Sequence, residues 1–477
     1  MLNLSEKKNG GEENMKIKNF IFICLLIGLV VGLRVLPVQA ATPAQISTAI
    51  DKGLKWLAGE QAVDGHIPGL WGDGTADATT GLVVLKFLDR AKELKKDPFQ
   101  TDNTKTDYYE YATVVTKGFE YIFNNLDILS SNRVTSNDWY PVYSTGIVMM
   151  AVATAPDPNK VITNGALNGW TYKQAAQGMM DWFASVQETN GAWLYSGAGN
   201  DNSSSGYATL GVGFASSLNG FGLTIPGSIY SNLDSFIDTI RETSGTHKGA
   251  SVYRFTWRAW PNIYKTGNLL YEMALVGDTL STQRVKDAIA YIEAKWDSSA
   301  AGTHADGGGW KDYQAMFGMM KGLEAFKIEE LKIGAGGALE PWFEEVSTYI
   351  VNNQVDVGSD KGYWNNEYGT HLGTAWALIT LERAVEKVEF GIPGQCRKSG
   401  DIFASFDADD SVVFGLAPFT WTWAGNTDLT VTKDANNVFV ITYPSGWTGS
   451  ESIIFTVTDS NGKVSDDEAT FTVHPVI

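Results

Sequence analysis

The sequence GMMDWFASVQETNGAW, residues 178–193, holds a pattern that recurs along most of this 477-residue chain. Trp182 lies in an amphipathic stretch, Gln187 follows it five residues later, and a glycine-containing turn leads to Trp193. An aromatic anchor, a polar turn and an aromatic marker return about every 55 to 65 residues, which is typical of a repeat architecture. Because a second apolar stretch follows each marker, every unit is predicted to be a helix, a loop and a second helix.

Six such units can be aligned between residues 42 and 388. The aromatic anchors are Trp56, Tyr121, Trp182, Phe236, Tyr291 and Tyr349, and the markers are Trp71, Trp139, Trp193, Tyr253, Trp310 and Trp364. The second stretch of each unit also contains a glycine: Gly81, Gly146, Gly211, Gly267, Gly318 and Gly373. A glycine within a helix costs about 1 kcal/mol relative to alanine, so its return in every unit indicates that these helices pack closely.

The two helices of a unit differ in polarity. The run from Gly81 to Leu85 is apolar on all sides, whereas Asp51, Lys55 and Glu60 give the preceding helix a wet face. We therefore expect the second helices inside and the first helices outside. An open superhelix would need distinct polar capping repeats, and none is evident in the sequence, so a closed ring is favoured. The expected fold is an (α/α)6 toroid of six helical hairpins.

Three units carry a family resemblance. Lys52 to Leu57 with Gln61 and Gly69-Leu70-Trp71, then Gly178 to Trp193, then Tyr349, Gln354 and Gly362-Tyr363-Trp364, resemble the glutamine-tryptophan repeat of squalene and oxidosqualene cyclases. The resemblance extends over residues 42–388 and implies a toroid of the terpenoid cyclase and prenyltransferase superfamily around a central cavity. It also implies a structural role for the repeat residues, which tie adjacent helices together: Trp56, Gln61, Trp182, Gln187, Tyr349 and Gln354.

The catalytic motifs of that superfamily are mostly missing. The aspartate-rich DxDD string of class II cyclases occurs once, as Asp407, Ala408, Asp409 and Asp410, but it follows the sixth unit. It is interpreted as a proton donor, as an exposed acidic loop, or as a calcium site, since clustered carboxylates suit that ion. Prenyltransferases hold zinc with a cysteine, and the helical region has none, because the two cysteines are Cys24 and Cys396. We expect no zinc and no cofactor, with calcium as the one candidate ion.

Polar residues near the starts of the inner helices remain as candidates for chemistry: Asp73, Asp77, Asp312, Glu367 and His371. A pair of carboxylates there could act as general acid and base, or hydrolyse a sugar. Alternatively, an aspartate at a helix start caps free backbone N–H groups. The indoles of Trp71, Trp193, Trp310 and Trp364 could form a platform for a sugar or an isoprenoid, or could belong to the core. His304 and Asp306 form a His-Ala-Asp pattern that suits either a metal ligand pair or a solvated turn.

The composition changes after Phe390. Glycine and proline punctuate residues 391–394, and alternating β-branched and aromatic runs follow, such as Val438 to Thr442 and Ile453 to Thr458. We expect a linker over residues 389–400 and a β-sandwich over residues 401–477. The stretch from Gly446 to Gly462 resembles the cadherin-like and immunoglobulin-like modules of prokaryotic surface proteins, which implies an adhesive or spacer role.

The N-terminus predicts export. Lys16 and Lys18 precede an apolar run from Phe20 to Leu33, and Ala40 offers a cleavage position, so residues 1–40 are interpreted as a signal peptide, with Met15 as an alternative start. An uncleaved anchor is the alternative, and only then would the chain contact a membrane. The net charge of −18 argues against nucleic acid as a partner.

Two functions fit these observations, beside a purely structural role at the cell surface. The first is a secreted or surface protein whose toroid binds a carbohydrate, a small hydrophobic molecule or a surface protein. The second is an extracellular enzyme, either a carbohydrate-active hydrolase or lyase or a divergent terpenoid cyclase, that uses cavity carboxylates.

Overall fold

The structure is a computed structural model that describes two stretches of the chain, a helical region, residues 40–383, and a strand region, residues 389–474, each with gaps. The described residues are 40–69, 74–194, 201–216, 220–300, 302–356, 358 and 361–383, then 389–390, 395–398, 403, 405–409, 412–414, 418–458 and 464–474. Residues 1–39, with nearly all of the expected signal peptide, lie outside them, as do Trp71, Asp73 and Asp410.

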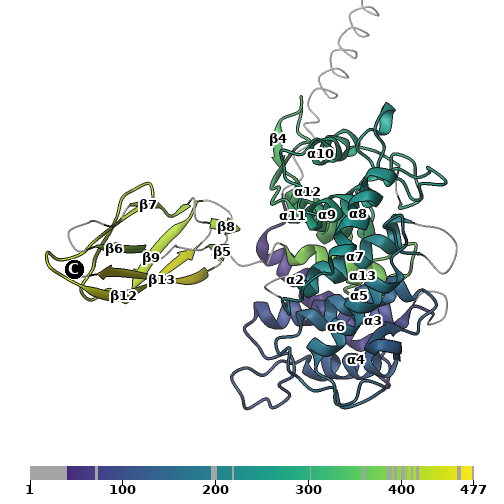
Figure 1. Ribbon diagram of the computed structural model, residues 1–477, viewed down its shortest axis with the longest axis horizontal. Helices are drawn as coiled ribbons and strands as arrows, with labels where there is room; N and C mark the ends of the chain where they lie inside the picture. Colours follow the sequence, from purple (N-terminus) through teal and green to yellow (C-terminus); the bar gives the residue numbers. More distant parts are fainter. Residues whose placement is uncertain are drawn as a thin grey trace, which may run out of the picture. The chain divides into compact units, whose positions relative to one another are not determined.

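Twelve α-helices occupy the first stretch within the described residues, and they alternate between two sets (Figure 1). The first set comprises α2 (Pro43–Glu60), α4 (Ala112–Asn124), α6 (Tyr172–Val186), α8 (Gly227–Ile240), α10 (Gln283–Lys295) and α12 (Trp342–Asn352). The second comprises α3 (Ala76–Glu93), α5 (Pro141–Thr154), α7 (Asn202–Ser216), α9 (Ile263–Leu275), α11 (Tyr313–Ala325) and α13 (Thr370–Glu382). Short hairpins join some of them: β1 (Leu126–Leu129) with β2 (Arg133–Ser136), and β3 (Glu330–Lys332) with β4 (Leu339–Pro341).

The second set packs in cyclic order. Helix α3 contacts α5, α5 contacts α7, and the series runs through α9 and α11 to α13, which contacts α3 again. These helices are buried on nearly every side; in α13 every residue from Leu372 to Leu381 is buried. The first set is amphipathic, and α2 exposes Asp51, Lys55 and Glu60. The polarity expected from the sequence is therefore the polarity observed.

Glycines permit the closest approaches between neighbouring helices of the second set. A Cβ added to Gly146 in α5 would lie 2.3 Å from the carbonyl oxygen of Tyr207 in α7, and one added to Gly211 would lie 2.6 Å from the carbonyl oxygen of Gly146. Gly267 of α9 meets Gly318 of α11 in the same way. Gly373 differs from expectation, because its neighbours are Trp364 and Asn366 in the segment before its own helix.

The repeated glutamines join successive helices of the first set. The side-chain amide of Gln61 donates to the carbonyls of Gly65 (3.0 Å) and Val114 in α4 (2.9 Å). Gln187 donates to Gly191 and to Ile229 in α8, and Gln354 donates to Gly362 and to Ala49 in α2. The contact from Gln354 joins the last unit to the first. Of the anchors beside these glutamines, Trp182 is buried, whereas Trp56 and Tyr349 are partly buried.

The aromatic marker of the second unit is placed differently from those of the third and sixth units. One hydrogen bond recurs in four units. In each, a backbone N–H in the segment before a second-set helix donates to a side-chain hydroxyl of that helix: Trp193 to Ser205 (3.1 Å), Trp364 to Thr374 (3.0 Å), Ile67 to Thr80 (2.9 Å) and Ser136 to Thr145 (2.9 Å). Ser136 thus takes the place that the sequence alignment gave to Trp139, and Ile67 makes the same contact in the first unit. Trp139 is 63% exposed, so its position in the alignment is wrong.

The second stretch consists of short strands. One sheet has the order β6 (Gln395–Lys398), β13 (Val464–His474), β12 (Gly449–Thr458) and β9 (Thr420–Ala424), in which β6 runs parallel to β13 and the other pairs are antiparallel. A second sheet orders β10 (Thr430–Lys433), β11 (Val438–Thr442) and β7 (Phe406–Asp407). Phe439 and Ile441 from the second sheet share one apolar cluster with Phe455 and Phe471 from the first.

The expected linker over residues 389–400 is wrong in part. β5 (Glu389–Phe390) pairs with β8 (Val412–Phe414), and β6 pairs with β13, so this segment contributes strands to the sheets. The glycines and proline at residues 391–394, which suggested the linker, lie outside the described residues.

Candidate functional site

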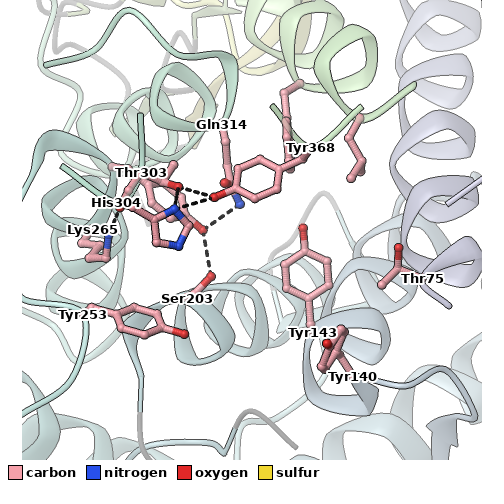
Figure 2. Close-up of a pocket in the computed structure, with 13 residues that line it drawn as sticks. Thr75, Tyr140, Tyr143, Ser203, Tyr253, Lys265, Thr303, His304, Gln314 and Tyr368 are labelled. Atoms are coloured by element: carbon pink, nitrogen blue, oxygen red, sulfur yellow. Dashed lines mark hydrogen bonds between the residues drawn. The ribbon is translucent and has the colours of Figure 1, made fainter. Parts of the chain in front are cut away.

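A cavity of about 210 Å³ lies where the second-set helices begin. Its lining comes from the first turns of these helices and the loops before them: Thr75, Tyr140, Tyr143, Ser203, Tyr253, Tyr264, Lys265, Thr303, His304, Gln314, Tyr368, Leu372 and Trp376. Figure 2 shows the hydroxyl of Tyr143 on one side of this space and Ser203, His304 and Tyr368 on the other. Every helix of the second set supplies at least one lining residue, either from its own first two turns or from the loop before it.

Helix caps fix the geometry of two of these starts. The side chain of Asn262 accepts the backbone N–H of Lys265 (3.1 Å), and that of Asp312 accepts the N–H of Ala315 (3.0 Å). These contacts start α9 and α11 at Ile263 and Tyr313. Because of that register, Tyr264 and Gln314 fall at the second position of their helices and contact each other.

Hydrogen bonds connect several polar side chains of the cavity lining. Gln314 Nε2 donates to the hydroxyl of Tyr264 (3.1 Å), which lies 3.4 Å from Ser203 Oγ. Below them, Trp376 Nε1 donates to the hydroxyl of Tyr207 (3.0 Å). Burial raises the pKa of Tyr264 and of Tyr207 above the usual value for tyrosine. Both hydroxyls therefore keep their protons and can donate as well as accept.

Lys265 is a buried amine in the cavity wall. Its Nζ donates to the backbone carbonyl of Thr303 and lies 5.5 Å from the ring centroids of Tyr253 and Tyr264. Burial lowers the pKa of Lys265 to about 7, and the negative charges of Asp201, Asp306 and Asp312 only partly oppose that effect. No carboxylate among the described residues lies within 4.0 Å of this amine, so near neutral pH it is divided between charged and neutral forms.

His304 stands at the edge of the cavity. Its Nδ1 lies 3.0 Å from the hydroxyl of Tyr368, and that hydroxyl lies 2.6 Å from Thr303 Oγ1. Partial burial lowers the pKa of His304 below its usual value, and the nearby Lys265 lowers it further. The imidazole is therefore mainly neutral at pH 7, and its Nδ1 can accept a hydrogen bond from the hydroxyl of Tyr368.

Among the carboxylates expected from the sequence, the described ones, Asp77, Asp312 and Glu367, do not line this cavity. Asp77 is buried in the first turn of α3, where its Oδ2 accepts the hydroxyl of Ser136 (2.5 Å). Burial and, after it, the charge of Asp138 raise the pKa of Asp77 to about 8. Burial also raises the pKa of Asp138 to about 6. The buried Asp77 and the partly buried Asp138 interact through their charges, and the sequence did not indicate this pair.

The remaining candidates lie elsewhere. Asp312 and Glu367 border a separate hollow of about 490 Å³ beside α12, in which Asn366 Nδ2 donates to Asp312 (2.9 Å). His371 pairs with Glu60 (3.1 Å) and stacks on Trp56, with ring centroids 5.2 Å apart. Asp73 lies outside the described residues.

Of the four indoles expected to form a platform, three do not line the cavity, and the fourth, Trp71, lies outside the described residues. Trp193, Trp310 and Trp364 are fully buried in the helical core, and the first and last donate to the backbone carbonyls of Phe183 and Ile350. The core alternative therefore applies to all three. The aromatic groups that do line the cavity are His304, Trp376 and several tyrosines. The sequence singled out only Tyr253, as a repeat marker, and His304, as a metal candidate, and missed the others. Tyrosine recurs at the junction of loop and second helix in several units, and that recurrence was the available signal: Tyr140, Tyr143, Tyr253, Tyr264 and Tyr368.

The metal candidates also have other partners. Asp409 accepts Trp421 Nε1 (2.8 Å) and Asn437 Nδ2 (3.0 Å), while Asp407 accepts the N–H of Asp409. His304 bonds Tyr368, whereas Asp306 accepts the N–H of Trp260 (2.7 Å). Across the described part of the chain, no group of three or more His, Cys, Asp or Glu side chains could hold an ion.

Within the same described residues, no helix is long and apolar enough to cross a bilayer.

Comparisons with known proteins give a likeness in structure only. No family model and no curated protein matches the sequence. Among solved structures, the chain is similar to the type II terpene cyclase MstE from Scytonema. A variant of that enzyme in complex with its substrate geranylgeranyl dihydroxybenzoate shares 12% identity at a TM-score of 0.43, over 72% of this chain and 98% of that one. The apo enzyme shares 12% identity at a TM-score of 0.44, over 72% and 99% of the two chains.

Proposed function

We propose that this protein binds a small polar ligand, the size of one sugar ring, in the cavity at the starts of the second-set helices. The observation that carries the proposal is the lining. Every lining residue except Leu372 has a hydroxyl, amide, amine, imidazole or indole group, and many also offer an aromatic face. A sugar ring combines hydroxyl edges with apolar faces, so this surface matches both of its features.

The volume supports a sugar over a hydrophobic molecule. Sites for drug-sized ligands usually measure about 300 to 1,000 Å³, whereas this cavity has about 210 Å³. A long isoprenoid would extend beyond this volume. An isoprenoid would also make no hydrogen bonds with the polar groups of the lining, whereas the hydroxyls of a sugar can make them.

The enzyme alternative has a specific observation in its favour. The neutral His304 and the hydroxyl of Tyr368 are hydrogen-bonded at the cavity edge, an arrangement suited to moving a proton to or from a bound ring. Hydrolysis by paired carboxylates has less support, because none of the described lining residues is Asp or Glu. Incubating the protein with oligosaccharides and analysing the products by mass spectrometry tests this alternative.

We place this binding function in an exported protein. The helical region is proposed to be an (α/α)6 toroid of the terpenoid cyclase type, which the cyclic packing of α3 to α13 supports. The strand region is proposed to be a cadherin-like or immunoglobulin-like sandwich that acts as a spacer, which the shared cluster of Phe439, Phe455 and Phe471 supports. The apolar run from Phe20 to Leu33 supports secretion or display at the cell surface.

Saturation-transfer NMR with single compounds tests the binding function. The panel contains glucose, galactose, mannose and xylose, with geraniol as the short isoprenoid. We expect one or more sugars to bind and geraniol not to bind. Tyr264→Phe should weaken sugar binding about three- to tenfold, the equivalent of one hydrogen bond. Tyr230→Phe, on the exposed face of α8, should leave binding unchanged. Binding of geraniol alone would overturn the proposal.

A further inference from the structure

An aromatic run leads out of the cavity along the segment before α9. Tyr253 and His304 line the cavity, and the ring of Trp260 contacts both, with centroids 5.3 Å and 4.7 Å away. Trp257 then packs edge-on against Trp260, with centroids 4.7 Å apart. Trp257 is 53% exposed. The run therefore begins at the cavity wall and ends in solvent.

The backbone of Trp260 is held in a strained conformation. Its φ of 56° lies in the left-handed region, which costs a bulky residue about 1 to 3 kcal/mol. Asp306 Oδ1 accepts the N–H of Trp260 (2.7 Å), and the N–H of Tyr253 donates to the carbonyl of Ala259 (2.9 Å). Such strain persists only where its surroundings fix it, and here it turns the indole toward Tyr253 and His304.

Arg258 fastens the same segment to the end of α8. Its guanidinium donates to Glu242 Oε1 (3.0 Å) and to the carbonyls of Thr239 (2.9 Å) and Arg241 (2.7 Å). The last carbonyls of a helix carry partial negative charge, so a cation is well placed there. These hydrogen bonds of Arg258 hold the turn in place, and the neighbouring Trp257 on this turn is exposed to solvent.

We propose that Trp257 and Trp260 form a platform that binds the second ring of an oligosaccharide whose terminal ring occupies the cavity. This inference rests on the proposed function and extends it from one ring to a chain. The cavity has room for one ring, and its wall continues through Tyr253 and Trp260 to an exposed indole. The flat apolar face of a pyranose can stack on that indole while its hydroxyls stay in water. A platform fixed before binding loses little conformational entropy when the ring arrives.

The net charge of the protein indicates which kind of oligosaccharide it can bind. A protein with a net charge of −18 repels polyanions at long range. The ligand inferred is therefore a neutral oligosaccharide rather than a sulfated or uronate-rich one.

Calorimetric titration with sugars of increasing length tests the platform. For whichever of glucose, galactose, mannose and xylose binds, the probes are that monosaccharide and its di- and trisaccharides in α and β linkage. The variants are Trp257→Ala and, as a matched exposed aromatic, Tyr230→Ala. We expect a disaccharide of one linkage to bind about tenfold more tightly than the monosaccharide to the unmodified chain. Trp257→Ala should remove that gain and leave monosaccharide affinity unchanged, and Tyr230→Ala should change neither.

The outcomes separate the two proposals. Equal affinity for all lengths, or an equal loss for all lengths in Trp257→Ala, overturns the platform and leaves the single-ring cavity standing. Binding of no sugar of any length overturns the proposed function and this inference together. Arg258→Ala gives a second measurement, because a loosened turn should reduce the disaccharide gain without changing the monosaccharide affinity.

Discussion

Asp77 is a neutral carboxylic acid in the folded protein near pH 7, because burial and the neighbouring Asp138 raise its pKa to about 8. In the unfolded chain its pKa is near 4. Between about pH 4 and pH 8, Asp77 is protonated in the folded state and ionised in the unfolded state. The free energy of unfolding therefore falls as the pH rises through this range, and the stability that the protonated group provides is complete only below about pH 4. The slope approaches about 1.4 kcal/mol per pH unit.

Asp77→Asn should remove this dependence, because the amide cannot ionise and still accepts the hydroxyl of Ser136. Urea denaturation at pH 5, 6.5 and 8 should show the variant gaining stability over the unmodified protein as the pH rises. Asp107→Asn, at an exposed position, provides the control. A constant difference across this range would show that Asp77 is ionised in the folded state.

Lys265 gives the opposite sign. Its pKa falls from about 10.4 in the unfolded chain to about 7 in the folded one, so folding releases a proton between these values. The cost of burying this amine is therefore greatest below pH 7 and disappears as the pH approaches 10. Lys265→Met should be more stable than the unmodified protein at pH 7, and chemical denaturation should show that advantage shrinking by pH 9. An advantage that grows with pH would contradict this account.

At the scale of elements, the contact between α5 and α7 depends on glycine. A methyl group on Gly211 would meet the carbonyl oxygen of Gly146 at 2.6 Å, so the two helices would have to separate. Gly211→Ala should destabilise the protein by about 1 to 3 kcal/mol, although alanine favours a helix by about 1 kcal/mol. Gly59→Ala in α2, where no atom lies within 4 Å, should be neutral or stabilising. Thermal denaturation of the two variants decides between packing and helix propensity.

Much of the element order could be predicted from the sequence, and the site could not. The 3.6-residue pattern and the glutamine spacing locate helices such as α6 because a helix's core face repeats locally. The cavity gathers Ser203, Lys265 and Tyr368 from three separate loop and helix junctions, and nothing local marks side chains that meet only through the fold. The marker Trp139 was misaligned for a related reason, because an indole near a loop looks the same in sequence whether it is buried or exposed.

At the scale of the whole molecule, the helices and the strands have separate apolar clusters. We therefore expect two unfolding transitions in scanning calorimetry. Phe455→Ala removes a fully buried ring from the strand cluster and should cost that transition about 3 to 5 kcal/mol. The helical transition should keep its midpoint. A single transition that shifts as a whole would show that the two regions unfold together.

The bond from Gln354 to Ala49 and the ion pair between Lys52 and Asp356 (2.8 Å) join segments about 300 residues apart. During synthesis the beginning of the chain emerges long before its final neighbour, so the apolar side of α3 that α13 covers stays open to water until residue 382 has been made. Non-local contacts of this kind slow folding, and the intermediates that form before them expose apolar surface and are prone to aggregate. A fragment that stops before α13 should accordingly keep this apolar side exposed and aggregate, whereas the complete helical region should not.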